Sequence, residues 1–319
     1  MNYYENLIFE GGGMKAISYA KIPTVLDKFG ILQNIKRVAG SSAGSIAALL
    51  IALKYDPEEI EETISAMSFE SFKDVHSYTF HFVNILTKNG INSGHYFEAW
   101  IKEKIRYKTN SKFTTFEEAY EMTGIELVVT GTNLKTGETE YFSYKNTPKM
   151  ELWRAIRISI SIPLFFKLIE YNNDLYMDGG ILSNYPIWIF DSDSTYDLGP
   201  VDHEIDEFKH IKTLGFKLIP EESEKNLTSF FIPILNVVIG LVFLLLNYIS
   251  VNNEMIYDNS ANTVGINTLD ISAVEFDLPD DKKKVLISNG EIATTRFLEN
   301  KRRNELNRLK VNKEYSWMT

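Results

Sequence analysis

The stretch Arg37-Val38-Ala39-Gly40-Ser41-Ser42-Ala43-Gly44-Ser45-Ile46 decides the fold class. A short apolar lead, the pentad Gly40-x-Ser42-x-Gly44 and a run of small residues predict a strand, a tight turn and a helix, with Ser42 at the turn. Such a turn strains its central residue and leaves room only for small neighbours. The Ser42 hydroxyl would then lie at a helix N-terminus, where backbone N–H groups favour developing negative charge. Ser42 is therefore a candidate nucleophile, and a plain small-residue loop ending in a helix cap is the alternative.

A second strand-loop-helix unit precedes this stretch. The apolar run Leu7-Ile8-Phe9 leads into Gly11-Gly12-Gly13-Met14-Lys15, and apolar residues recur at helical spacing from Ile17 to Phe29. Two consecutive units of this kind predict a parallel sheet flanked by helices. Their loops would gather at the carboxyl ends of the strands, where sites in such folds usually lie.

The glycine run itself is a candidate binding loop. Three successive glycines let a backbone approach a ligand closely and present its N–H groups as a nest, which suits either a phosphate or an oxyanion. The run lacks the spacing of the dinucleotide and Walker motifs, so the nearby Ser42 turn favours the oxyanion hole. Lys15 either holds the loop, attracts an anionic substrate or is simply exposed.

Composition excludes several classes of function. The chain has 319 residues and a net charge of −10, which argues against nucleic-acid binding. It contains no cysteine, so disulfides, thiolate metal sites and cysteine nucleophiles are excluded. The first ten residues lack the features of a secretory signal, which predicts a cytoplasmic protein.

Further along, one carboxylate follows a short strand. A hairpin is predicted over 126–144, a helix over 152–162 that Pro163 stops, and a strand at Leu175-Tyr176-Met177 that ends at Asp178-Gly179-Gly180. Asp178 would therefore reach the same rim as the glycine run and Ser42. An ordinary Asp-Gly turn is the alternative.

Four segments now stand in one order: Gly11-Gly12-Gly13-Met14-Lys15, Gly40-Ser41-Ser42-Ala43-Gly44, Ser159-Ile160-Ser161-Ile162-Pro163-Leu164-Phe165-Phe166, and Asp178-Gly179-Gly180 followed by Asn184-Tyr185-Pro186. Together they resemble the patatin-like phospholipase family. The similarity covers roughly residues 5–300, because 263–270 and 276–298 also resemble the family's final strand and helix. We therefore expect one catalytic domain over 1–300 and a basic tail over 301–319.

The resemblance implies a three-layer α/β/α fold with a central, mostly parallel sheet and a Ser-Asp dyad. It makes Ser42 the nucleophile and Asp178 the base, without a metal or a cofactor. It places the oxyanion hole at Gly11, Gly12, Gly13 and the N–H of Met14, supported by Gly40, Gly44, Lys15, Gly179 and Gly180. Ala16 departs from the glycine that is common in the family.

The implied reaction is hydrolysis of phospholipid or lysophospholipid esters through an acyl-enzyme on Ser42. One alternative is a Ser-Asp-His triad with His203 or His210. His203 lies in the acidic run 197–207, which is typical of a solvated loop, and His210 precedes an expected strand over 211–218. Another is a lipid-binding or scaffolding protein that keeps the fold without activity.

Two segments bear on membrane contact. Residues 230–249 are apolar apart from a proline, a glycine and two asparagines, which fits a buried or pocket-lining helix, a helix in contact with lipid, or a membrane span. A span would separate two expected strands of one sheet, so the buried helix is favoured and peripheral membrane contact is the next option. The basic tail reads as a solvated helix or as a contact for anionic lipid.

Overall fold

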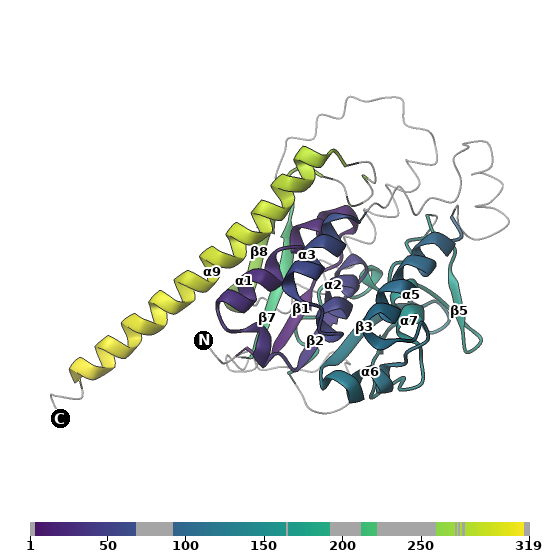
Figure 1. Cartoon of the computed structure of the whole chain (residues 1–319), viewed down its shortest axis with the longest axis horizontal. Coiled ribbons are helices and arrows are strands. Elements are labelled where there is room, and N and C mark those ends of the chain that lie inside the picture. Colours follow the sequence, from purple (N-terminus) through teal and green to yellow (C-terminus); the bar gives the residue numbers. More distant parts are fainter. Residues whose placement is uncertain are drawn as a thin grey trace.

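The described part of the chain forms one mixed sheet with helices packed against it (Figure 1). The computed structural model describes residues 4–67, 92–163, 165–191, 212–221, 260–271, 273, 275 and 278–315. Within these residues the strand order is β5-β6-β3-β2-β1-β7-β8, and β4 pairs with β3 outside that path. The strands are β1 (Asn6–Phe9), β2 (Arg37–Gly40), β3 (Glu126–Asn133), β4 (Glu138–Phe142), β5 (Ile169–Tyr171), β6 (Asp174–Asp178), β7 (Thr213–Ile219) and β8 (Thr263–Asn267).

The predicted α/β class with a mostly parallel sheet is confirmed. Strands β1, β2, β3, β7 and β8 pair in parallel, whereas β4, β5 and β6 join the sheet antiparallel. Alternate residues of β1 enter two separate apolar clusters, because successive side chains of a strand point to opposite faces. Leu7 and Phe9 join the large cluster that contains the helices, and Ile8 packs against Tyr185 and Ile187 in the smaller one.

The helices follow local signals in the sequence. α2 (Ala43–Ala52) is buried along its whole length, as expected of a helix that is apolar all round. α3 (Pro57–Ser65) begins with proline and a capping box between Asp56 and Glu59. Other described helices are η2 (Leu32–Asn34), α5 (His95–Thr109), α6 (Phe116–Thr123), α7 (Leu152–Ser159), η4 (Gly179–Ile181) and η5 (Ser260–Asn262).

The stretch from Ile17 to Phe29, where apolar residues recur at helical spacing, forms parts of two helical elements rather than one helix. A 3-10 helix, η1 (Gly13–Tyr19), is followed by α1 (Ile22–Lys28). Pro23 lies in the first turn of α1, where its missing N–H costs nothing, whereas inside a continuous helix it would break a hydrogen bond. The proline therefore separates the two elements.

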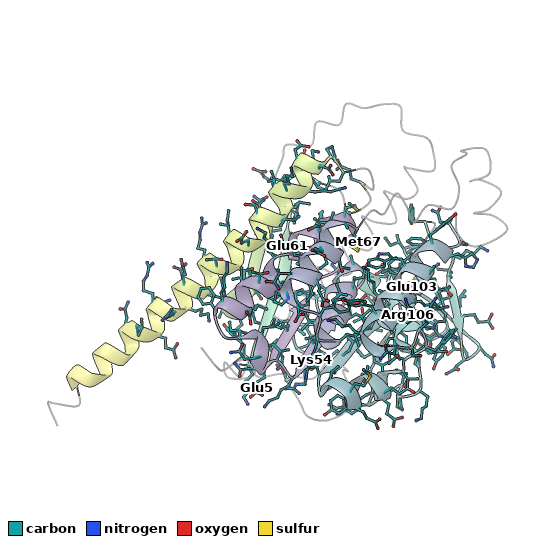
Figure 2. All side chains as sticks on the ribbon, in the orientation of Figure 1. Glu5, Lys54, Glu61, Met67, Glu103 and Arg106 are labelled. Carbon is teal, nitrogen blue, oxygen red and sulfur yellow. The ribbon has the colours of Figure 1, made fainter. Side chains whose placement is uncertain are left out.

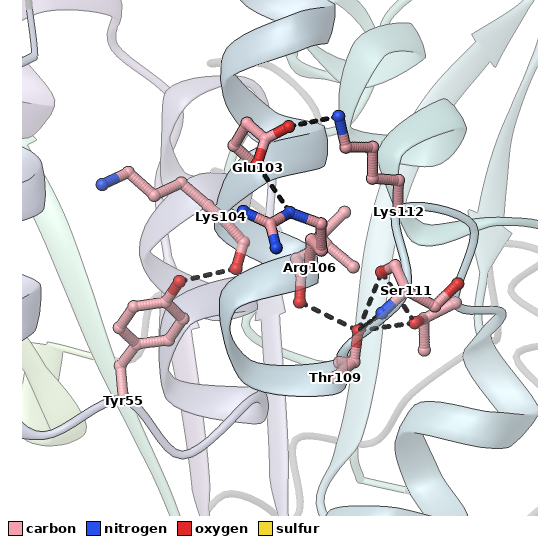
Figure 3. Close-up of polar contacts among 9 residues, drawn as sticks. Tyr55, Glu103, Lys104, Arg106, Thr109, Ser111 and Lys112 are labelled. Carbon is pink, nitrogen blue, oxygen red and sulfur yellow. Dashed lines mark hydrogen bonds and ion pairs between the residues drawn. The ribbon is translucent and has the colours of Figure 1, made fainter.

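Polar contacts connect the end of α2 to α5. The hydroxyl of Tyr55, just after α2, donates to the carbonyl of Lys104 at 2.6 Å (Figure 3). On the same helix Glu103 accepts from the Arg106 Nε at 2.7 Å and pairs with Lys112. Figure 2 shows the side chains of Glu103 and Arg106 on this helix, well separated from Glu61 on α3.

The antiparallel entry of β6 positions the site. Val129 of β3 pairs with β2 and β4, and Gly131 pairs with β4 and β6, so β2 and β6 share the edge of β3 opposite β4. Gly40, the last residue of β2, lies opposite Val129, and Asp178, the last residue of β6, lies opposite Gly131. The two strands thus run toward each other along one edge, and their carboxyl ends meet.

The C-terminal helix α9 (Asp280–Tyr315) crosses the predicted boundary between the catalytic domain, which ends at residue 300, and the basic tail, which begins at residue 301. It packs closely on η1, because a Cβ added to Gly290 would lie 1.9 Å from the carbonyl oxygen of Ser18. Lys21 pairs with Glu291 of α9 at 3.1 Å. The last turns of α9 project beyond the rest of the molecule (Figure 1).

Three features predicted from sequence lie outside the described residues: His203, His210 and the apolar segment 230–249. Among the helices that the structure does describe, none combines the length and the apolarity needed to cross a membrane.

Candidate active site

Ser42 occupies the turn between β2 and α2 in a strained conformation. Its backbone has φ 47° and ψ −128°, a region that a residue with a side chain rarely adopts. A Cβ added to Gly40 would lie 2.4 Å from the Gly44 carbonyl oxygen, and one on Gly44 would lie 2.4 Å from the Phe9 carbonyl oxygen. The pentad therefore uses glycine at both positions because strand and helix backbones come too close for any side chain.

The strained turn brings the Ser42 hydroxyl to Asp178. Its Oγ donates to Asp178 Oδ2 at 2.7 Å, and the two side chains are 7% and 5% exposed. The other carboxylate oxygen, Oδ1, accepts from the amide of Gly180 at 2.7 Å. Among the described residues these two groups are the hydrogen-bond partners of the carboxylate, so the structure brings the predicted serine and aspartate together.

Burial shapes the protonation of Asp178. Loss of water around the carboxylate raises the pKa of Asp178 to about 7, although the hydrogen bonds from Ser42 and the Gly180 amide act in the opposite direction. A carboxylate with a pKa near neutrality is a far stronger base than an exposed one and is still ionised in part at pH 7. The electrostatics of the pair therefore suit proton abstraction from a hydroxyl.

The backbone on both sides of the pair is fixed by the end of α7. The amide of Ser42 donates to the Ser159 Oγ at 2.9 Å, and the amide of Asp178 donates to the Ser161 carbonyl at 3.0 Å. Ser159 and Ser161 lie in the predicted helix over 152–162 and in the segment that resembles the family. No local pattern indicates that Ser159 would hold the turn, because its partner is distant in sequence.

The glycine run lies against the nucleophile. A Cβ on Gly11 would come within 2.9 Å of the Ser42 Cβ, so only glycine allows this approach. The amides of Gly11 and Met14 already donate to the carbonyls of Asn184 and Ala273, at 3.2 and 3.3 Å. Within the described residues, the amides of Gly12 and Gly13 have no hydrogen-bond partner. Of the four amides expected at the oxyanion hole, those of Gly11 and Met14 therefore donate to carbonyls of the protein in this structure.

The remaining predicted residues support these loops. Gly179 lets η4 pass close to β3, because a Cβ there would lie 2.1 Å from the Thr130 Oγ1. Gly180 donates its amide to Asp178 as described. Lys15 is half-buried in η1, one residue beyond the Met14 amide.

Metal ligands do not cluster in the part of the chain that the structure covers: no group of three or more histidine, aspartate or glutamate side chains gathers there. His95, the histidine in that part, is exposed at the start of α5.

Comparison with known proteins gives a consistent result. The family model described as patatin-like phospholipase matches residues 7–191. The chain is 30% identical over 186 residues to "Probable lipid hydrolase 463L" of Invertebrate iridescent virus 6, covering 58% of this chain and 62% of that protein. It is also 30% identical to the uncharacterized protein R571 of Acanthamoeba polyphaga mimivirus, over 90% of this chain and 91% of that one.

Solved structures show the same fold at low identity. VipD from Legionella pneumophila superposes with a TM-score of 0.59 at 17% identity, covering 93% of this chain and 67% of that chain. At this identity the similarity concerns the fold alone.

Proposed function

The chain belongs to the patatin-like phospholipase family, and we propose that it is a serine acyl hydrolase that cleaves carboxylic ester bonds of phospholipids or lysophospholipids. The observation that carries this proposal is the 2.7 Å hydrogen bond from Ser42 Oγ to Asp178 Oδ2 at a strained turn. The name of one relative supports the lipid substrate, since that protein is described as a probable lipid hydrolase.

The first half-reaction forms an acyl-enzyme. Ionised Asp178 accepts the proton of Ser42 as Oγ attacks the ester carbonyl, and the carbonyl oxygen becomes an oxyanion. The amides of Gly12 and Gly13 are the proposed donors to that oxyanion, because among the described residues they have no hydrogen-bond partner and their loop lies against Ser42. The C–O bond then breaks, and protonated Asp178 returns the proton to the leaving alcohol oxygen.

The second half-reaction releases the fatty acid. Asp178 takes a proton from water, which attacks the acyl carbonyl, and the same amides hold the second oxyanion. Collapse breaks the bond to Ser42 Oγ, which recovers its proton from Asp178. The cycle consumes one ester and one water, and neither a metal nor a histidine enters these steps.

A test compares the wild type with Ser42→Ala and Asp178→Asn on a soluble nitrophenyl ester and on a lipid panel read by mass spectrometry. We expect each variant to lose about 1,000-fold or more in kcat, because each removes a group that the chemistry requires. Release of free fatty acid from a phospholipid or lysophospholipid identifies the substrate class. Wild-type turnover equal to that of the variants would instead favour a lipid-binding protein without activity.

The triad alternative has its own control. Replacing His203 and His210 together with alanine should leave ester hydrolysis nearly unchanged. A loss as large as that of Ser42→Ala would favour a Ser-Asp-His mechanism.

A further inference from the structure

We propose that Glu10 and Asn184 are positioning residues that set the geometry of the oxyanion loop, residues 11–14. This inference rests on the proposed function and assigns a role to a buried carboxylate and a half-buried amide outside the dyad. Glu10 is the last residue before the glycine run, and its side chain is enclosed, since the residue is only 7% exposed. A carboxylate is rarely buried in a protein unless hydrogen bonds or charges compensate it.

The Glu10 carboxylate replaces a missing hydrogen bond of the sheet. The Glu10 amide donates to the Phe216 carbonyl at 3.1 Å, as in a regular parallel ladder between β1 and β7. The next bond of such a ladder would run from the Leu218 amide to the Glu10 carbonyl. Instead, the Leu218 amide donates to the Glu10 Oε2, and the Glu10 carbonyl accepts from the Tyr19 hydroxyl at 2.8 Å. The side chain thus lets the backbone leave the sheet without leaving a buried donor unsatisfied.

Asn184 holds the first glycine from both sides. Its backbone carbonyl oxygen accepts from the Gly11 amide at 3.2 Å, and its side-chain Nδ2 donates to the Gly11 carbonyl at 3.0 Å. The same Nδ2 donates to the Glu10 Oε1 at 3.3 Å, which orients the amide group. The two carboxylate oxygens of Glu10 therefore anchor β7 on one side and Asn184 on the other.

This arrangement couples the loop to the dyad. Asn184 follows Ser183, whose carbonyl accepts from the Ser41 hydroxyl at 2.6 Å, beside the nucleophile. Leu218 also contacts the loop through its side chain, because a Cβ on Gly12 would lie 2.4 Å from the Leu218 Cδ1. The Gly12 and Gly13 amides are consequently placed by Glu10 and Asn184 relative to Ser42.

Isosteric substitutions test this role. In Glu10→Gln, the side-chain NH2 group must face either the Leu218 amide or the Asn184 amide, donor against donor. In Asn184→Asp, a carboxylate replaces the group that donates to the Gly11 carbonyl and to Glu10. The matched controls are Glu126→Gln, at a buried carboxylate that pairs with Lys145 at 3.1 Å, and Asn6→Asp, at a buried amide at the other end of β1.

The measurements are kcat and KM on a soluble ester, the melting temperature, and inhibition by a trifluoromethyl ketone, whose adduct with the serine places an oxygen where the oxyanion forms. We expect Glu10→Gln and Asn184→Asp to lower kcat by about 10- to 100-fold with KM nearly unchanged, because small misplacements of catalytic donors cost that much. The inhibition constant of the ketone should rise in parallel. The two control variants should keep kcat and ketone affinity even if their melting temperatures fall.

The outcomes distinguish failure of the positioning role from failure of the proposed function. Wild-type kcat in both site variants, an increase in KM alone, or equal losses in the controls would overturn the positioning role while leaving the proposed function intact. Turnover that persists in Ser42→Ala would overturn the proposed function, and the positioning role with it.

Discussion

At the scale of single residues, the pKa of Asp178 makes activity depend on pH. Burial raises it from the ordinary 3.8 to about 7, and the base must be ionised to accept the proton of Ser42. We therefore expect kcat/KM on a soluble ester to fall tenfold per pH unit below about pH 7 and to level off above it. A profile that stays flat down to pH 5 would contradict the assignment of Asp178 as the base.

Because Asp178 is buried, its ionised form also lowers the free energy of unfolding. The folded-state pKa lies above the unfolded value, so between about pH 4 and pH 7 the folded protein holds a proton that the unfolded chain has released, and stability falls as pH rises. The full cost, at most about 4 kcal/mol, is reached above pH 7. Asp178→Asn should therefore raise the melting temperature at pH 8 and change it little at pH 4. An equal change in melting temperature at both pH values would contradict the raised pKa of Asp178.

At the scale of elements, the packing of α9 against η1 supports the glycine loop. Gly290 allows the contact, since a Cβ would lie 1.9 Å from the Ser18 carbonyl oxygen. Alanine normally stabilises a helix by about 1 kcal/mol relative to glycine. We expect Gly290→Ala to destabilise instead, by about 1–3 kcal/mol, because α9 must move away from η1.

Urea unfolding measures this effect, with Ser288→Ala as the control on an exposed position of the same helix. Turnover should fall in Gly290→Ala as well, because η1 begins at Gly13 of the loop. Stabilisation in both variants would show that α9 does not need its close contact with Ser18.

The elements also show what could be predicted from sequence. Local patterns were sufficient for the strand, turn and helix around Ser42, for β1 and its glycine run, and for the hairpin of β3 and β4. Asp178 was expected at the site because it follows a strand, yet β6 arrives antiparallel, along the edge of β3 that it shares with β2. Strand direction here depends on pairing between residues far apart in sequence, which no local periodicity encodes.

The contacts that hold the Ser42 turn and the glycine loop could not be predicted from sequence for the same reason. Ser159 holds the Ser42 amide across 117 residues, and the Glu10 carboxylate takes the Leu218 amide across 208. Among the expected oxyanion donors, Gly11 and Met14 turned out to be occupied by carbonyls of Asn184 and Ala273. Motif spacing identifies the residues of the loop but not the partners that use some of its donors.

At the scale of the whole molecule, the projecting end of α9 is separable from the catalytic body. Lys301 still contacts the body, since its Nζ donates to the Asn262 Oδ1 at 3.2 Å. Residues 302–307 are exposed, although α9 itself continues to Tyr315. A backbone without burial contributes little to the stability of a fold.

Removing residues 303–319 should therefore shift the melting temperature by no more than about 2 °C, because the described side chains in this range, 303–307, are exposed and exposed residues change stability by only about 0.5 kcal/mol. Turnover of a soluble ester should be unchanged, since the deletion leaves α9 seated on η1 through Gly290. Hydrolysis of anionic and neutral phospholipid vesicles should also be retained if the basic end is a solvated helix. A loss confined to anionic vesicles would mean that Arg303 and the basic residues after it contact the lipid surface, since the attraction of lysine and arginine to such a surface depends on its charge.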